Sequence, residues 1–164
     1  MDKDIVNVLA HSDAETVKGL LENGEPIETS VLNDALLRAC GRGNSRLNNV
    51  RLLLEHGADV HTSNDDALCI AIAGVQEPHL VRLLLEYGAD ASACDNFPLK
   101  TIGNTIRMFQ IYNVRKFMAL YEEYVALFMS YGADPTGIIP QNIIDKVTVD
   151  TKPATLIPCT QHNR

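Results

Sequence analysis

The sequence has no tryptophan, and none of its apolar runs approaches the roughly 20 residues needed to span a bilayer. Its first four residues, Met1-Asp2-Lys3-Asp4, lack the basic and then apolar pattern of a secretory signal. Cysteine is sparse and scattered, and no Cys-x-x-Cys pair occurs. We therefore expect a protein that is not secreted and works in a reducing compartment, the cytoplasm.

Positive charge is also in short supply. The chain carries 14 Lys and Arg against 21 Asp and Glu, a formal net charge of -7. An acidic protein has no general field that attracts nucleic acid or an anionic membrane, so neither is an expected partner. The length of 164 residues fits one compact domain, which can bury a core without disulfides or metals.

Patterns typical of catalysis or metal binding are missing as well. The five histidines form no close ligand pair; His61 and Cys69 are near in sequence, but a structural zinc site usually needs four ligands. Gly41-Arg42-Gly43-Asn44 lacks the Lys-Ser/Thr of a phosphate-binding loop, and no nucleophile-elbow motif occurs. The sequence therefore predicts no catalytic residue, no metal site and no cofactor, so the chain is not expected to be an enzyme.

What the sequence does contain is an internal repeat. Four segments end alike, each with an apolar stripe followed by glycine: Val17 to Gly24, Val50 to Gly57, Val81 to Gly88 and Val125 to Gly132. Apolar residues at i, i+3 and i+4 predict a helix with one buried face. The glycine lies just past the helix end, where it can adopt a left-handed conformation without a Cβ clash.

A second element recurs between these helices and once after the last of them. Its clearest copies are Asp34-Ala35-Leu36-Leu37-Arg38-Ala39 and Asp66-Ala67-Leu68-Cys69-Ile70-Ala71, with weaker copies at 97–102 and 141–146. The alanines let neighbouring helices approach closely. A single pair of such helices cannot bury its apolar face alone, so stability must come from stacking successive pairs.

This pattern, Asp-Ala-Leu-x-x-Ala followed by Val-x-Leu-Leu-Leu-Glu-x-Gly-Ala-Asp, resembles ankyrin repeats. The segment from Gly57 to Leu68 has a short finger and is similar to the ankyrin repeats of giant DNA viruses of amoebae. The resemblance implies an all-α solenoid of about four helix-hairpin repeats with a closing half-repeat, and a role in binding another protein. The expected boundaries are 1–32, 33–64, 65–95 and 96–139 for the repeats and 140–147 for the half-repeat, within one domain, 1–147. The tail, 148–164, is expected to be extended or disordered.

The last full repeat departs from the pattern, because its glycines are 44 residues apart rather than 33 or 31. Residues 109–131 hold most of the aromatic side chains, and those from Phe117 onward share one helical face. We expect a lengthened outer helix from about 114 to 131, preceded by an irregular loop. This aromatic ridge, which includes Phe117, Tyr121 and Tyr124, either packs on the protein's own core or serves as a docking surface for a partner or for self-assembly.

The resemblance places partner binding on the finger tips and on the concave face of the inner helices. The candidate contact residues are Arg38, Arg42, His61, Ser63, Asn64, Asp65, Ile70, Cys94, Asp95 and Asn96. Arg38 and Arg42 begin a run of arginines that either forms a patch for an acidic partner or is paired with nearby carboxylates. The expected partner is another protein, for a viral chain a host factor, bound by a monomer; the alternative is a structural, self-assembling protein.

Overall fold

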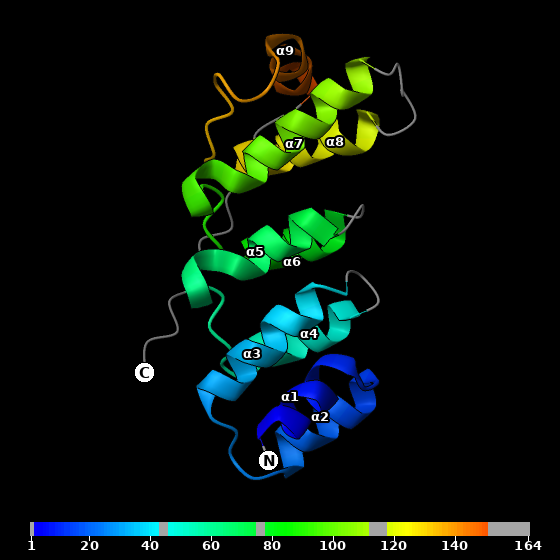
Figure 1. The fold of residues 1–164 in the computed structure, drawn as a ribbon, viewed down its shortest axis with the longest axis vertical. Helices are drawn as coiled ribbons and strands as arrows, with labels where there is room; N and C mark the ends of the chain where they lie inside the picture. Colours follow the sequence, from blue (N-terminus) through cyan, green and yellow to red (C-terminus); the bar gives the residue numbers. More distant parts are fainter. Residues whose placement is uncertain (1, 43–45, 75–77, 112–117, 151–164) are drawn as a thin grey trace.

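The computed structural model describes residues 2–42, 46–74, 78–111 and 118–150, and within these ranges the chain is helical and has no strand. Figure 1 shows the helices following one another along an elongated stack. Their bounds are α1 Asp2–His11, α2 Ala14–Asn23, α3 Thr29–Cys40, α4 Leu47–Glu55, α5 Thr62–Gly74, α6 Pro78–Glu86, α7 Ala93–Ile111, α8 Met118–Ser130 and α9 Gln141–Asp150. None of these helices is both long enough and apolar enough to cross a membrane.

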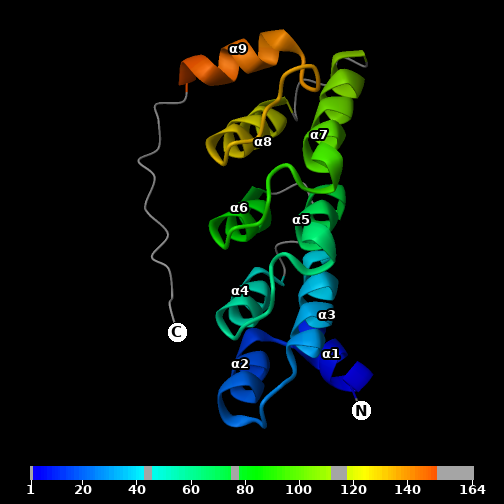
Figure 2. The same ribbon diagram turned by 90° about the vertical axis from the view of Figure 1, so that its left-hand side faces the viewer.

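The first eight helices form two layers, seen side by side in Figure 2. The inner layer is α1, α3, α5 and α7, each of which contacts the next, and the outer layer is α2, α4, α6 and α8. Helix α9 lies over the end of the stack against α8. This arrangement is the stacking of helical pairs that the repeat pattern predicts.

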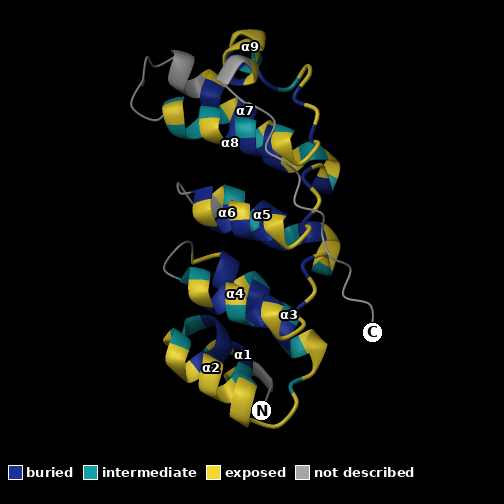
Figure 3. Cartoon of the chain, turned by 180° about the vertical axis from the view of Figure 1, so that it is seen from behind, coloured by how far each residue is buried: buried dark blue, intermediate teal, exposed yellow. Residues whose placement is uncertain are grey.

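The residues that define the repeat also form the core. Ala35, Ala39, Ala67 and Ala71 are completely buried between inner helices, where their small side chains allow close packing. The apolar stripes of α4, α6 and α8 are largely buried against the inner layer, whereas in α2 Val17 is buried and Leu20 is exposed. Figure 3 shows buried and exposed residues alternating along the outer helices. Because each pair buries its apolar face against its neighbours, the core is one continuous column.

The glycines after the outer helices behave as predicted in three of the four repeats. Gly57, Gly88 and Gly132 have φ values of 94°, 95° and 86°. At each of these ends the next N–H reaches back to a carbonyl five residues earlier, as in the bond of 3.0 Å from Ala58 to Leu53, which closes a Schellman cap. Gly24 differs, since its φ is -85° and the backbone there is extended.

The insert of the last full repeat lengthens both of its helices. The irregular loop expected ahead of residue 114 is wrong for residues up to 111, because α7 continues as a helix to Ile111. The outer helix α8 has 13 residues, against nine in both α4 and α6, and its predicted start near 114 lies outside the described residues. Aromatic spacing alone did not reveal that residues 100–111 also have apolar side chains at helical intervals, including the buried Ile102 and Ile106.

The closing helix runs further than the sequence indicated. Helix α9 extends to Asp150, so the first three residues of the predicted tail are helical, and residues 151–164 lie outside the described ranges. The segment leading into α9 packs tightly on α7: a Cβ added at Gly103 would lie only 2.7 Å from the Ile138 carbonyl oxygen. The Arg107 guanidinium donates a hydrogen bond of 2.6 Å to the same oxygen, which fixes this segment on α7.

Candidate functional site

Two of the predicted arginines lie on the surface of the inner layer. Arg38, in the last turn of α3, and Arg42, just beyond it, are both exposed. The Arg38 guanidinium donates to the Asn7 side-chain oxygen of the preceding inner helix at 3.3 Å. The Arg38 side chain has no ion pair within 4 Å among the described residues, whereas Arg42 has an interaction partner of its own.

An apolar side chain adjoins these arginines. Ile70 of α5 is half-buried, and a Cβ added at Gly41 would lie 3.6 Å from Ile70 Cγ2. Gly41 sits between Arg38 and Arg42 in the chain, so the turn after α3 brings the apolar group against the basic segment. Three residues predicted for the inner-helix face are thus gathered at one place in the fold.

The third arginine of the run, Arg46, has a structural role instead. It is half-buried and donates a hydrogen bond of 2.9 Å to the Ser12 carbonyl oxygen. The fully buried Asn49 side chain donates to the same oxygen at 2.9 Å and to the Leu9 carbonyl at 3.2 Å. Because α1 ends here, these donors satisfy carbonyls that the end of a helix leaves without partners. No local pattern indicates this role for Asn49, since its partners are about 40 residues away in the chain.

Two of the finger turns have an unusual backbone. Ser63, Asn64 and Asp65 have φ values of 53°, 62° and 60°, and Cys94, Asp95 and Asn96 repeat this conformation one repeat later, at 52°, 56° and 58°. Each triplet is a single left-handed turn, a conformation that disfavours most side chains by about 1–2 kcal/mol per residue. Asn and Asp tolerate it best, and they fill two of the three positions in each triplet. The six predicted finger-tip residues from these turns therefore share one geometry.

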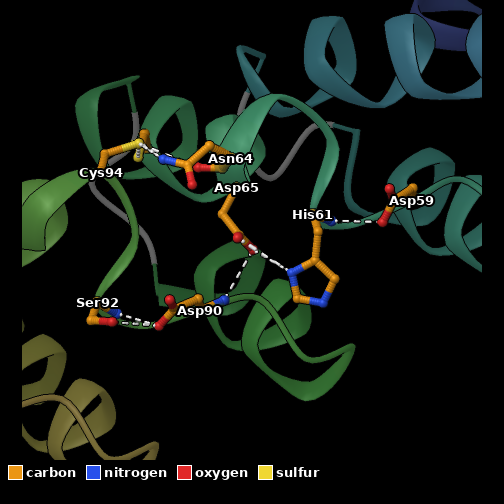
Figure 4. Close-up of polar contacts among 8 residues, drawn as sticks. Asp59, His61, Asn64, Asp65, Asp90, Ser92 and Cys94 are labelled. Atoms are coloured by element: carbon orange, nitrogen blue, oxygen red, sulfur yellow. Dashed lines mark hydrogen bonds and ion pairs between the residues drawn. The ribbon is translucent and has the colours of Figure 1, made fainter.

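Asp65 is a correction to the predicted contact set, because its side chain points into the protein. The residue is 5% exposed, and its carboxylate accepts a hydrogen bond of 3.0 Å from the Asp90 backbone N–H of the next finger. The His61 ring nitrogen Nδ1 lies 3.1 Å from the same carboxylate (Figure 4). In the preceding finger, Asn33 has the equivalent role, since its side-chain oxygen accepts from the Asp59 N–H at 2.7 Å. Asp65 thus joins neighbouring repeats and is not available to a partner.

The remaining finger residues stay accessible. His61, Ser63, Asn64 and Asp95 are exposed, whereas Cys94 and Asn96 are half-buried. The Lys100 ammonium lies 2.6 Å from the Asp95 carboxylate, and this contact lowers the pKa of Asp95 below its usual value. In the same loop, the Ser92 hydroxyl and N–H both donate to Asp90, which lowers the pKa of that carboxyl group.

The fold brings Cys69 and Cys94 together, which the sequence analysis missed. Their sulfur atoms lie 3.0 Å apart, although the residues are 25 positions apart in the chain. Burial and the neighbouring Cys94 thiol raise the pKa of Cys69 to about 12, and burial raises that of Cys40 to about 12. The Cys69 and Cys40 thiols are therefore protonated near neutral pH, which is not the state of a catalytic nucleophile.

The predicted aromatic ridge is largely part of the core. Tyr124 is 2% exposed and Phe128 is completely buried, so of the two alternatives for the ridge, packing on the protein's own core holds for Tyr124 and the docking alternative is wrong. Tyr121 is half-buried, with its ring centroid 5.9 Å from that of Tyr124. Phe117 lies outside the described residues. The helical spacing of these residues is correct, but the face they share is turned toward the protein's own inner layer.

Comparison with known families agrees with the repeat geometry. The sequence model for ankyrin repeats (3 copies) matches residues 5–95, more than half of the chain. The chain belongs to the ankyrin-repeat family. Searches of curated proteins and of solved structures give no match for this ankyrin-repeat protein.

Ankyrin repeats are generally protein–protein interaction modules, and the family is typically non-enzymatic. The family match ends at Asp95, within the second left-handed turn. The rest of α7, together with α8 and α9, extends the stack of this ankyrin-repeat protein beyond the matched residues.

Proposed function

We propose that this ankyrin-repeat chain is a non-enzymatic module that binds another protein through its inner-helix face and finger tips. The observation that carries the proposal is that exposed Arg38 and Arg42 flank Gly41, which lies next to the half-buried Ile70. Guanidinium groups match carboxylates in shape and charge, and an apolar centre supplies area that binding can remove from water. The partner segment is therefore acidic and carries at least one apolar side chain.

The scaffold supports this mode of binding because it is already ordered. Arg38 is held by Asn7 of the adjacent helix, and the left-handed turns fix the finger residues Ser63, Asn64 and Asp95. A rigid surface loses little conformational entropy when it binds, so more of the contact energy remains as affinity. The accessible finger residues His61, Cys94 and Asn96 extend the surface along the stack.

The proposed module is one unit of four repeats, 1–32, 33–64, 65–95 and 96–139, closed by a half-repeat from 140. The packing of α7 on α5 and of α8 on α6 supports the fourth repeat, which lies beyond the family match. The short finger supports a relation to the repeats of giant DNA viruses, and on that basis the partner is a host factor in the cytoplasm and the chain acts as a monomer.

The test is capture of partners from lysate followed by mass spectrometry. Arg38→Glu combined with Arg42→Glu reverses the charge beside Ile70 and is expected to abolish capture. The matched control reverses two exposed charges on outer helices, Lys18→Glu with Arg51→Glu, and is expected to retain the same partners. Circular dichroism confirms that each variant is folded. An unchanged partner set in the Arg38/Arg42 variant would show that binding occurs elsewhere.

A further inference from the structure

A compact group of three potential metal ligands lies where helix α5 meets the finger turn at residues 94–96. The Asp66 carboxylate and the sulfur atoms of Cys69 and Cys94 all lie within 4.8 Å of one another. Asp66 and Cys69 are three residues apart on α5, which places them on one face of the helix. Cys94 comes from the left-handed turn of the next repeat, so the group exists only when the two repeats are stacked.

The position of Cys94 follows from the local backbone. Its φ of 52° belongs to the left-handed turn, and its sulfur lies 3.3 Å from the Asn64 carbonyl oxygen of the preceding finger (Figure 4). The equivalent residue one repeat earlier is Ser63, so this turn does not itself require a cysteine. The thiol at this position therefore adds a chemical function that the turn geometry leaves unexplained.

Asp66 completes the group because its carboxylate is not used elsewhere. The neighbouring Asp65 is committed to His61 and Asp90, whereas the Asp66 side chain has no hydrogen bond or ion pair with any other residue that the structure describes. Asp66 and Cys94 are half-buried and Cys69 is buried, so the group is sheltered but remains partly accessible to solvent.

We propose that Asp66, Cys69 and Cys94 form a binding site for a thiophilic divalent cation of the zinc class. Two sulfur ligands favour Zn²⁺ over Mg²⁺ and Ca²⁺, which bind through oxygen. Tetrahedral Zn²⁺ accepts Cys and Asp ligands, and three protein ligands leave the fourth position for water or for a group from a partner. The ion would join α5 to the left-handed turn at the start of α7 and so fasten two repeats together. The competing chemistry is a Cys69–Cys94 disulfide, which would leave the Asp66 carboxylate without a role.

The experiment uses the full chain with a phosphine reductant present, and Cd²⁺ as an optical probe for thiolate ligation. We expect one equivalent of Cd²⁺ to give an ultraviolet thiolate-to-cadmium band, and Zn²⁺ to displace it. Cys94→Ser, which copies the natural Ser63 turn, should fold and lose the band. Asp66→Asn should keep the fold and weaken the affinity by about tenfold or more.

Cys40→Ala is the matched control, because it removes a described thiol that is not part of the group and should leave the band unchanged. The proposal is overturned if no band forms, if the band survives in Cys94→Ser, or if Asp66→Asn binds as tightly as the natural chain. Closure of Cys69 and Cys94 to a disulfide despite the reductant, seen as a loss of two hydrogens by mass spectrometry, would also overturn it.

Discussion

The carboxylate of Asp65 accepts a hydrogen bond from the backbone N–H of Asp90, and so one finger supports the next. The bond is 3.0 Å long and is sheltered by the burial of Asp65. Its counterpart between Asn33 and Asp59 shows that the same connection occurs one repeat earlier with an amide oxygen as acceptor. Repeat-to-repeat order in this protein therefore rests on specific polar contacts as well as on apolar burial.

Replacing Asp65 tests that connection. Asp65→Ala leaves the Asp90 N–H without its acceptor and places alanine in a left-handed conformation, so we expect the free energy of unfolding to fall by about 2 kcal/mol. Asp65→Asn keeps both an acceptor oxygen and a residue that tolerates this backbone, and should change stability by less than about 1 kcal/mol. Urea denaturation measures both, and equal losses in the two variants would contradict this role.

The left-handed turn predicts that a substitution to glycine stabilises the protein, the opposite of its usual effect in a helix. Ser63 has a φ of 53°, a conformation that glycine adopts without strain. Ser63→Gly should therefore raise the free energy of unfolding by about 0.5 kcal/mol, the relief of strain slightly exceeding the added entropy of the unfolded chain. Ser30→Gly, in the first turn of α3, is the control and should lower it by about 0.5 kcal/mol. Destabilisation of the same size in both variants would argue against strain at Ser63.

The buried amide of Asn49 is predicted to be one of the most sensitive polar groups. Asn49→Ala removes the donor shared by the Leu9 and Ser12 carbonyls, and we expect a loss of about 2 kcal/mol in the free energy of unfolding. The adjacent Asn48 is exposed, and Asn48→Ala should alter stability by less than about 0.5 kcal/mol. The same denaturation measurement separates the two, and a similar effect of both changes would be inconsistent with the structure.

Two tyrosines of α8 and the turn after it are expected to behave differently. Tyr124→Ala opens a cavity in the core and should lower the free energy of unfolding by about 4 kcal/mol. Tyr131 is 42% exposed, and Tyr131→Ala should cost less than about 1 kcal/mol. Thermal unfolding checks both predictions. A nearly neutral effect of Tyr124→Ala would indicate that this tyrosine is exposed and would favour the docking alternative for the aromatic ridge.

The N-cap of α2 predicts a dependence on pH. The Asp13 carboxylate accepts from the Thr16 N–H at 2.9 Å and from its hydroxyl at 2.8 Å, and these bonds lower the pKa of Asp13 below 3.8. The charged cap therefore stabilises the fold at neutral pH, and this contribution is lost as the pH falls through the lowered pKa. Asp13→Asn should have a lower urea midpoint than the natural chain at pH 7, and the difference should shrink below pH 3.8. A difference that grows in acid would contradict the assignment.

The repeat could be predicted from the sequence because it depends on short-range patterns. The stripe ending at Gly57 and its copy at Gly88 lie 31 residues apart, and both the helix and the glycine turn follow from local preferences. The buried alanines of α3 and α5 follow in the same way, since their spacing marks the inner face of a stacked helix.

The predictions that differ from the structure concern side chains whose position depends on how one repeat packs on the next. Asp65 was predicted to contact a partner because it lies at a finger tip, but its side chain is buried within a turn of three successive left-handed residues. The spacing of Tyr124 identified a helical face without indicating what covers it. The contact between Cys69 and Cys94 depends on how one repeat seats on the next, which no pattern within a single repeat contains.

The single-file order of the stack determines how the molecule responds to mechanical tension. Within the described residues, the main contacts of each helical pair are with the pair before it and the pair after it. A chain pulled by its ends is therefore expected to unfold stepwise, one repeat after another from one end, rather than in a single event. Each unfolded 31-residue repeat adds about 100 Å to the contour length of the extended chain.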